Sequence, residues 1–389
     1  MGYMPRIYLD HNATTPVRPE VLEAMLPYFR GQFGNASSVH AFGQEAKGAL
    51  EDARAQVAAL LRATPGEIVF TSGGTEADNL GVIGTARARA SKGRHLLASA
   101  IEHDAVRHAH DALARQGFEV TWVSPGADGR VAPGAVEEAL RPDTILVSVM
   151  ATNNETGVVQ PVSEIGVLCA ARGIAFHVDA VQAAGKIPID VGAWRATTAA
   201  VAAHKIYGPK GAGALYVRRG TKPEPLQVGG EHERGLRAGT ENVPGIVGLG
   251  RAAELAAADP AETMPRIAGL RDRLEAELIA RVPGIVRHGA GAPRAGNTAH
   301  LSFPGAEGEH MILSLDMQGI AVSSGAACKA GSSHPSHVLL AMGVPRQIAQ
   351  TAVRFSLGRD TTDAEIDRVL EVVPAVVAKL RAASPTLAS

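Results

Sequence analysis

The sequence predicts an α/β protein whose larger part is built around a mostly parallel sheet. From about residue 45 to 250, helical patterns alternate with short apolar runs: EIVFTSG, RHLLASA, FEVTWVS, TILVSVM, IAFHVDA and GALYVRR. Such alternation is typical of βαβ units, in which helices cover both faces of the sheet. Polar clusters follow several of these runs directly, and ligands bind at the carboxyl ends of the strands in such sheets. We therefore expect a functional site at that edge.

The remainder of the chain predicts a smaller α+β unit. A length of 389 residues exceeds the size at which single cores usually stop growing. We expect a large domain over 16–258 and a small domain formed by 1–15 and 259–389. The final stretch, TTDAEIDRVLEVVPAVVAKLR, opens with a capping-box pattern, Thr362 with Glu365, and continues at helical period despite Pro374.

Composition narrows the class of partner. The chain is 46% hydrophobic and 20% charged, with a formal net charge of -1 and no long block of one sign. Nucleic-acid and membrane-surface binding are therefore not expected, and a small-molecule substrate fits better. The start, MGYMPRIYLDHNATTP, lacks the layout of a signal peptide, and no apolar run is long enough to cross a bilayer. We expect a cytoplasmic protein.

The two cysteines, Cys169 and Cys328, are too few for a disulfide framework or a four-cysteine zinc site. Cys169 lies in the helix-like EIGVLCAARGIAF and is expected to be a small buried hydrophobe. Cys328 lies in SSGAACKAGSSHPSH, residues 323–337, which we expect to be a mobile, exposed loop. An exposed thiol with a pKa of about 8.5 is partly thiolate near neutral pH and is a strong nucleophile.

Lys205 and Asp179 are the first candidates for chemistry. Lys205 follows an Ala/Val segment, where charge is costly, so its neutral amine could form a Schiff base; a surface lysine is the alternative. Asp179 follows the run IAFHV and could keep a pyridinium nitrogen protonated, as pyridoxal phosphate requires, or it could simply cap a helix.

Two further segments suit a phosphate and a planar ring. In SGGTEADN, residues 72–79, Gly74 and Thr75 open a helix after a strand, where backbone N–H groups can bind phosphate; an ordinary capped helix is the alternative. His103 could stack on a cofactor or carry protons. His108 and His110 are expected on a helix surface, and no metal site is expected.

These segments together resemble the cysteine desulfurases of the NifS/IscS type, within the class V aminotransferases. The similarity runs from YLDHNATTP to RFSLGRDTT and includes FGNASSVH, FTSGGTEADN, IEHDAV, NNETGVVQ, HVDAVQ, HKIYGPKG, HERGLRAGTENV and SSGAAC. It implies the fold type I of pyridoxal-phosphate enzymes, with a seven-stranded, mostly parallel sheet in the large domain, and pyridoxal 5'-phosphate as cofactor.

The resemblance also implies roles for individual residues. Lys205 would hold the cofactor covalently, Asp179 would pair with the pyridine nitrogen, and His103 would stack on the ring and move protons. The remaining cofactor contacts would come from Gly74, Thr75, Asn154, Gln182, His204 and, across a homodimer, Thr240. The substrate carboxylate would be bound by Arg354 with Asn35 and Asn154.

The reaction implied begins when Lys205 removes the Cα proton of L-cysteine. The Cys328 thiolate then attacks the substrate sulfur, which leaves L-alanine and a persulfide for a sulfur-acceptor protein such as an iron–sulfur scaffold. The sequence leaves open whether Cys328 also donates a ligand to a nascent cluster. The alternatives are another class V enzyme, such as a selenocysteine lyase or aminotransferase, and a non-catalytic assembly scaffold.

Two positions depart from the family pattern. Ala202 stands where relatives usually have a serine, so one hydroxyl donor to the phosphate is missing and weaker cofactor binding is expected. Glu231 stands where a third glycine is common, which adds bulk and negative charge near the neighbouring subunit's phosphate. The effect of Glu231 does not follow from the sequence.

Overall fold

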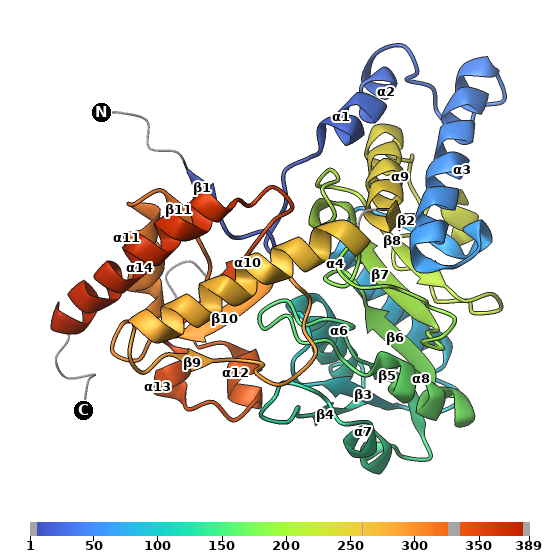
Figure 1. The fold of residues 1–389 in the computed structure, drawn as a ribbon. Helices are drawn as coiled ribbons and strands as arrows, with labels where there is room; N and C mark the ends of the chain where they lie inside the picture. Colours follow the sequence, from blue (N-terminus) through green and yellow to red (C-terminus); the bar gives the residue numbers. More distant parts are fainter. Residues whose placement is uncertain (1–5, 259, 326–334, 384–389) are drawn as a thin grey trace.

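A computed structural model describes residues 6–258, 260–325 and 335–383 of the chain (Figure 1). Its largest element is a seven-stranded sheet in the order β2-β8-β7-β6-β5-β3-β4. The strands, in that order, are Ile68–Thr71, Gly213–Val217, Thr198–Ala202, Ala175–Asp179, Thr144–Ser148, His95–Ser99 and Glu119–Val123. Strand β8 runs antiparallel to both neighbours, and the other pairs are parallel. The predicted mostly parallel sheet is confirmed.

Helices cover this sheet and connect its strands. The long helices α3 (Ala41–Leu61) and α9 (Val243–Ala258) pack against each other beside β2 and β8 (Figure 1). The others are α1 (Pro19–Met25), α2 (Pro27–Arg30), α4 (Gly74–Asn79), α5 (Thr85–Ala88), α6 (Asp104–Ala114), α7 (Pro133–Ala139) and α8 (Val162–Ala171), with short η1 (Pro65–Glu67), η2 (Leu80–Gly84), η3 (Ala203–Lys205) and η4 (His232–Gly235).

The rest of the chain builds a second group of elements around a three-stranded antiparallel sheet. Its order is β12-β10-β9, with bounds Ala352–Ser356, Thr298–Ser302 and Val286–Arg287. The short strand β1 (Ile7–Tyr8) pairs in parallel with β11 (Ile320–Ala321), so the start of the chain joins this group. The helices are α10 (Pro260–Arg281), α11 (Gly308–Asp316), α12 (His337–Ala341), α13 (Arg346–Ala349) and α14 (Asp363–Ala383).

Buried apolar side chains form separate cores around the two sheets. One cluster centres on the seven-stranded sheet with α3, α8 and α9. Another joins Ile7 and Leu9 to side chains of α10, β10, β12 and α14. Burial at about 25 cal/mol per Å² of apolar area stabilises each group. The domain limits given above stay a prediction.

The local predictions hold in part. The capping box is confirmed, since Thr362 N–H donates to Glu365 Oε2 at 2.8 Å and Glu365 N–H donates to Thr362 Oγ1 at 3.3 Å. His108 is exposed as expected, but the surface position of His110 is wrong because that ring is fully buried. His110 lies four residues after Val106, and tertiary packing buries the face of α6 that both residues share.

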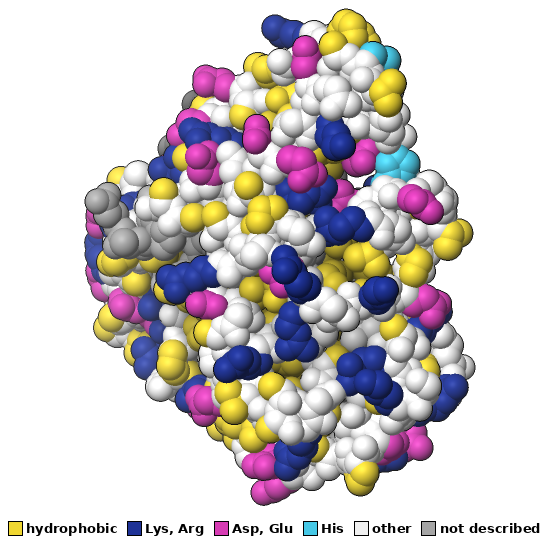
Figure 2. All heavy atoms as spheres, turned by 90° about the vertical axis from the view of Figure 1, so that its right-hand side faces the viewer, with side chains coloured by type: hydrophobic (Ala, Val, Ile, Leu, Met, Phe, Trp, Pro, Cys, Tyr) yellow, Lys and Arg dark blue, Asp and Glu magenta, His cyan; other side chains and the backbone are white. Residues whose placement is uncertain are grey.

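The outer surface is mixed in character. On the face shown in Figure 2, which includes α3 and α8, Lys and Arg side chains lie among acidic and apolar ones rather than in a block of one charge. Within the three described ranges, no helix is both long enough and apolar enough to span a membrane.

Candidate active site

Lys205 lies where the seven-stranded sheet meets the N-terminal segment. Strand β7 ends at Ala202, and the turn η3 carries the lysine beyond the carboxyl end of the strand. Its amine donates to the backbone carbonyl oxygens of Asn12, at 2.6 Å, and Ala13, at 2.8 Å. The side chain is half-buried, so its charge is only partly solvated.

Asp179 and His103 converge on the same edge of the sheet. Asp179 is the last residue of β6, is 5% exposed, and accepts a hydrogen bond from Val181 N–H at 2.9 Å. Burial raises its pKa, while the nearby His103 and Lys205 lower it. His103 caps α6, and its Nδ1 accepts from Ala105 N–H at 3.1 Å, which leaves Nε2 to carry the proton of the neutral ring.

A third side chain, Asp78, completes this cluster. Polar side-chain atoms of Asp78, His103 and Asp179 all lie within 4.8 Å of one another. Asp78 Oδ1 is 3.2 Å from His177 Nε2, and His177 Nδ1 is 3.0 Å from Thr198 Oγ1. Burial raises the pKa of Asp78 well above its usual value and lowers the pKa of His177 to about 3. Burial thus favours the neutral forms of both Asp78 and His177.

The segments predicted to bind phosphate lie on neighbouring loops. The chain turns from β2 into α4 at Gly74, where an added Cβ would lie only 3.0 Å from Val181 Cγ2. Thr75 follows and is exposed. His204 Nδ1 is 3.2 Å from Thr14 Oγ1, and burial, then Lys205, lowers the pKa of this ring to about 4. A neutral imidazole N–H is thus present beside Lys205.

Asn12 is the centre of a hydrogen-bond network that the sequence did not reveal. Its carbonyl also accepts from Gln182 Nε2 at 2.9 Å, and its Oδ1 accepts from Lys186 Nζ at 2.9 Å. Lys186 Nζ donates to Gln182 Oε1 as well. Burial, with Lys205 and Arg354 nearby, holds the pKa of Lys186 well below its usual value. The amide of Gln182 is thus engaged by protein groups at both ends.

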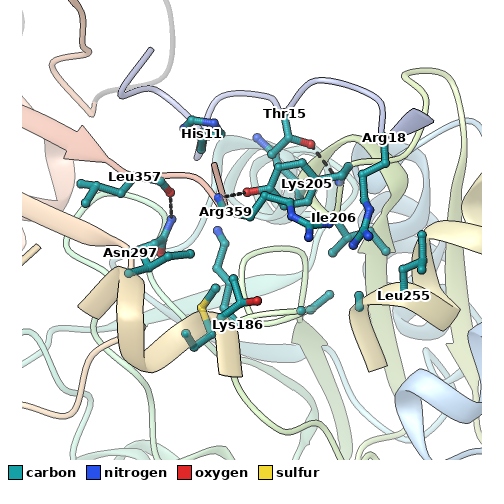
Figure 3. A pocket seen from close by; sticks show the side chains of 17 residues that line it. His11, Thr15, Arg18, Lys186, Lys205, Ile206, Leu255, Asn297, Leu357 and Arg359 are labelled. Carbon is teal, nitrogen blue, oxygen red and sulfur yellow. Dashed lines mark hydrogen bonds between the residues drawn. The ribbon is translucent and has the colours of Figure 1, made fainter. Parts of the chain in front are cut away.

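A cavity of about 40 Å³ adjoins this network (Figure 3). Lys186 and Lys205 line it together with His11, and apolar side chains from α9 and α10 form part of its wall. Neither Asp179 nor His103 lines this cavity.

Arg354, predicted to bind the substrate carboxylate, has a buried guanidinium that is only partly paired. It lies at the centre of β12 and is 4% exposed. Nη2 donates to Asp10 Oδ1 at 2.7 Å and Nη1 to the Asn154 carbonyl oxygen at 2.9 Å. Nε is buried and has no hydrogen-bond partner among the residues described. An unpaired buried guanidinium N–H is costly, and a bound carboxylate would satisfy it.

Two of the predicted residues lie outside this group. The loop that carries Asn35, between α2 and α3, lies away from the three-stranded sheet that carries Arg354 (Figure 1), and Asn35 is exposed. Thr240 is exposed too. Both loops adjoin one another, since Ser37 Oγ is 3.2 Å from His232 Nε2. The predicted roles of Asn35 and Thr240 thus stay predictions.

The two cysteines differ in what the structure describes. Cys169 is 0% exposed in α8, as predicted, and burial raises the pKa of its thiol to about 12. Cys328 lies outside the described residues. The loop was predicted to extend to His337, but helix α12 begins at this residue and Ser336 is its N-cap.

Comparison with known proteins assigns the family. The family model described as Aminotransferase class-V matches residues 7–369. The chain belongs to this family.

The more specific relatives are cysteine desulfurases. The chain is 50% identical over 384 residues to a protein named cysteine desulfurase IscS from Anaeromyxobacter dehalogenans, covering 97% of this chain and 94% of the relative. It is 49% identical to a protein named cysteine desulfurase from Trichormus azollae, covering 98% of this chain and 95% of the relative.

Solved structures of similar proteins have the same fold as this chain. A NifS-like protein superposes with a TM-score of 0.89 at 38% identity, covering 96% of this chain and all of the other. A structure titled "SspA in complex with cysteine" superposes with a TM-score of 0.81 at 37% identity, covering 92% of this chain and 100% of the other. The predicted resemblance, fold type and enzyme class, a cysteine desulfurase, are confirmed.

Proposed function

We propose that this chain takes sulfur from L-cysteine with pyridoxal 5'-phosphate as its cofactor and holds it as a persulfide on Cys328. The observation that supports this proposal most strongly is the convergence of Lys205, Asp179 and His103 at one edge of the sheet, beside the buried guanidinium of Arg354. These four groups supply an amine, an acid, a ring and a carboxylate clamp.

The residues fit the proposed cofactor chemically. Burial raises the pKa of Asp179, and a pyridinium nitrogen beside it would favour its charged form. Lys205 would hold the aldehyde carbon, Thr75 and His204 would hold the phosphate, and His103 would cover the ring. When bound, the cofactor supplies an electron sink for the charge left at the substrate Cα.

The protein groups divide the remaining work. Arg354 binds the substrate carboxylate, which fixes the Cα proton in the direction of Lys205. The Lys205 amine takes this proton from Cα and later returns a proton to the product. The Cys328 thiolate attacks the substrate sulfur, an S–S bond forms as the C–S bond breaks, and the electron pair stays on carbon. Protonation of that carbon fragment gives L-alanine.

We propose that the working unit is a homodimer. Six large apolar side chains near α1, α2 and the start of α3 are exposed: Leu22, Leu26, Phe29, Phe33, Val39 and Phe42. Exposed patches of this kind mark protein interfaces. A partner subunit would supply Thr240 to the phosphate and could supply Asn35, both of which are exposed in the single chain.

We also propose that a sulfur-acceptor protein, such as an iron–sulfur scaffold, receives the sulfur. The same cofactor contacts would serve selenocysteine lysis. Rates with L-cysteine and L-selenocysteine separate the two activities, since a lyase would act on selenocysteine alone.

Absorption spectroscopy tests the cofactor assignment. The loaded protein should show a visible band that shifts when L-cysteine is added. Lys205→Ala should lack the band, while Lys222→Ala, at an exposed lysine, should keep it. A normal band and normal alanine formation in Lys205→Ala would overturn the proposal.

A further inference from the structure

We infer that Glu155 is a positioning residue that fixes both ends of the segment carrying Cys328, an inference that rests on the proposed function. Glu155 is 1% exposed and belongs to the same loop as Asn154, whose carbonyl binds Arg354. Its backbone N–H donates to Asn153 Oδ1 at 3.0 Å, so the loop holds the carboxyl group in a defined place.

The far end of the segment is bound to Glu155 by a hydrogen bond. The Ser336 hydroxyl donates to Glu155 Oε2. The same hydroxyl accepts from Leu339 N–H at 3.1 Å and so caps α12. Ser336 is 2% exposed, so this bond is buried and its loss would leave a buried polar group unsatisfied.

The near end of the segment packs against the same side chain. A Cβ added to Gly325 would lie 3.3 Å from Glu155 Oε2 and 3.4 Å from its Cβ and Cγ. Gly325 has φ +84°, a conformation that favours glycine. Gly325 thus lies close to Glu155, with little room between them for a side chain, while Ser336 on the other side of 326–334 is hydrogen-bonded to the same side chain.

Both ends also connect to residues of the proposed active site. Ser323 and Arg354 exchange backbone hydrogen bonds of 2.6 and 3.2 Å. His337 Nε2 is 3.0 Å from the carbonyl oxygen of Glu102, the residue before His103. Because three extended residues span at most about 11 Å, the position of Gly325 limits where the Cys328 thiol can reach.

The charges around Glu155 come from several elements. Arg354 of β12 and Arg107 of α6 favour its ionised form, and Asp104 of α6 opposes it. Burial outweighs the Ser336 hydrogen bond and the cations, all of which lower the pKa of Glu155, and raises it to about 7. The Ser336 hydroxyl donates to Glu155 and so favours its ionised form.

The test compares Glu155→Ala, Glu155→Gln and the control Glu275→Ala, which removes another buried carboxyl group, one paired with Arg294. In the apoprotein, hydrogen exchange of residues 335–341 should be at least tenfold faster in Glu155→Ala only. In the loaded enzyme, single-turnover persulfide formation on Cys328 should be at least tenfold slower in Glu155→Ala, while the absorption shift on adding L-cysteine keeps its rate within twofold. Glu155→Gln, whose amide oxygen can accept from Ser336, should stay within threefold of wild type.

If hydrogen exchange and the rate of persulfide formation in Glu155→Ala equal those of the wild type, the inference is overturned. It is also overturned if the absorption shift and persulfide formation slow equally, because a merely structural role affects both steps. If Glu155→Ala does not fold, Ser336→Ala removes the same bond and must show the same separation of the two steps. No persulfide in the wild type would overturn the proposed function instead, and the exchange measurement on the apoprotein still judges Glu155.

Discussion

The amine of Lys205 donates a hydrogen bond of 2.6 Å to the backbone carbonyl oxygen of Asn12. Asn12 in turn donates its N–H to Ser356 Oγ, at 3.0 Å, in the three-stranded sheet. The lysine at the end of the large sheet is thus connected to the smaller sheet through one residue. The same smaller sheet carries Arg354, so the groups proposed to bind the cofactor and the substrate carboxylate are built on one continuous hydrogen-bond network.

Arg354→Lys should weaken the binding of L-cysteine. A lysine cannot reproduce the fork that contacts Asp10, Asn154 and a carboxylate together. We expect the L-cysteine concentration for half-maximal absorption shift to rise about 10- to 100-fold, or roughly 1.4–3 kcal/mol. Arg287→Lys, at a largely exposed arginine of β9, should change it less than twofold. Unchanged binding in Arg354→Lys would exclude the clamp.

Ala202→Ser should strengthen cofactor binding. Ala202 is 1% exposed, and its Cβ lies near the start of α4 at Gly74. A hydroxyl there could donate to the phosphate, a gain of about 1 kcal/mol and about fivefold in the dissociation constant measured by titrating the apoprotein.

The control for Ala202→Ser is Ala200→Ser, on the same face of β7, which buries a hydroxyl without a phosphate to bind. It should lower the melting temperature and leave affinity unchanged. If the wild type, Ala202→Ser and Ala200→Ser bind the cofactor equally well, the hydroxyl introduced by Ala202→Ser does not reach the phosphate.

Glu102→Gln should make the stability of the apoprotein less dependent on pH. Burial raises the pKa of Glu102 to about 8, against 4.5 for the unperturbed group. The folded state therefore favours the protonated form. The contribution of Glu102 to folding stability is therefore complete below pH 4.5 and is lost as the pH rises through 8.

At pH 7 this loss of folding stability is about 3 kcal/mol. Glu102→Gln avoids the loss because glutamine does not ionise. Its amide oxygen can still accept the hydrogen bonds from Ser99 and Met150. Thermal unfolding between pH 5 and 8 should show a melting temperature that falls more in wild type than in the variant. Parallel curves would show that Glu102 does not titrate in this range.

Mixed dimers should test the shared site. Lys205→Ala and Thr240→Ala homodimers should each lack normal activity or cofactor affinity. A mixed dimer places both changes in one site and leaves the other with Lys205 and the partner's Thr240 unchanged. We expect about half of wild-type activity per mixed dimer. No recovery on subunit exchange would contradict a site shared between subunits.

The sequence predicted the sheet because its apolar runs and polar clusters are local patterns. Asp179 and Lys205 could be placed at strand ends for the same reason. Asn12, Asp78 and Lys186 were missed although they lie within or beside quoted motifs, because their partners are far away in the sequence, as with Asn12 and Asn297. His110 was misplaced because the side of α6 that faces the sheet depends on tertiary packing.

The most direct test of the account is to identify the residue that carries sulfur after one turnover. The loaded protein would be mixed with one equivalent of L-cysteine, trapped with an alkylating reagent and digested for mass spectrometry. We predict one persulfide on Cys328 with one equivalent of L-alanine, unchanged in Cys169→Ser and absent in Cys328→Ser. Persulfide on Cys169, or full sulfur release in Cys328→Ser, would contradict the proposed function.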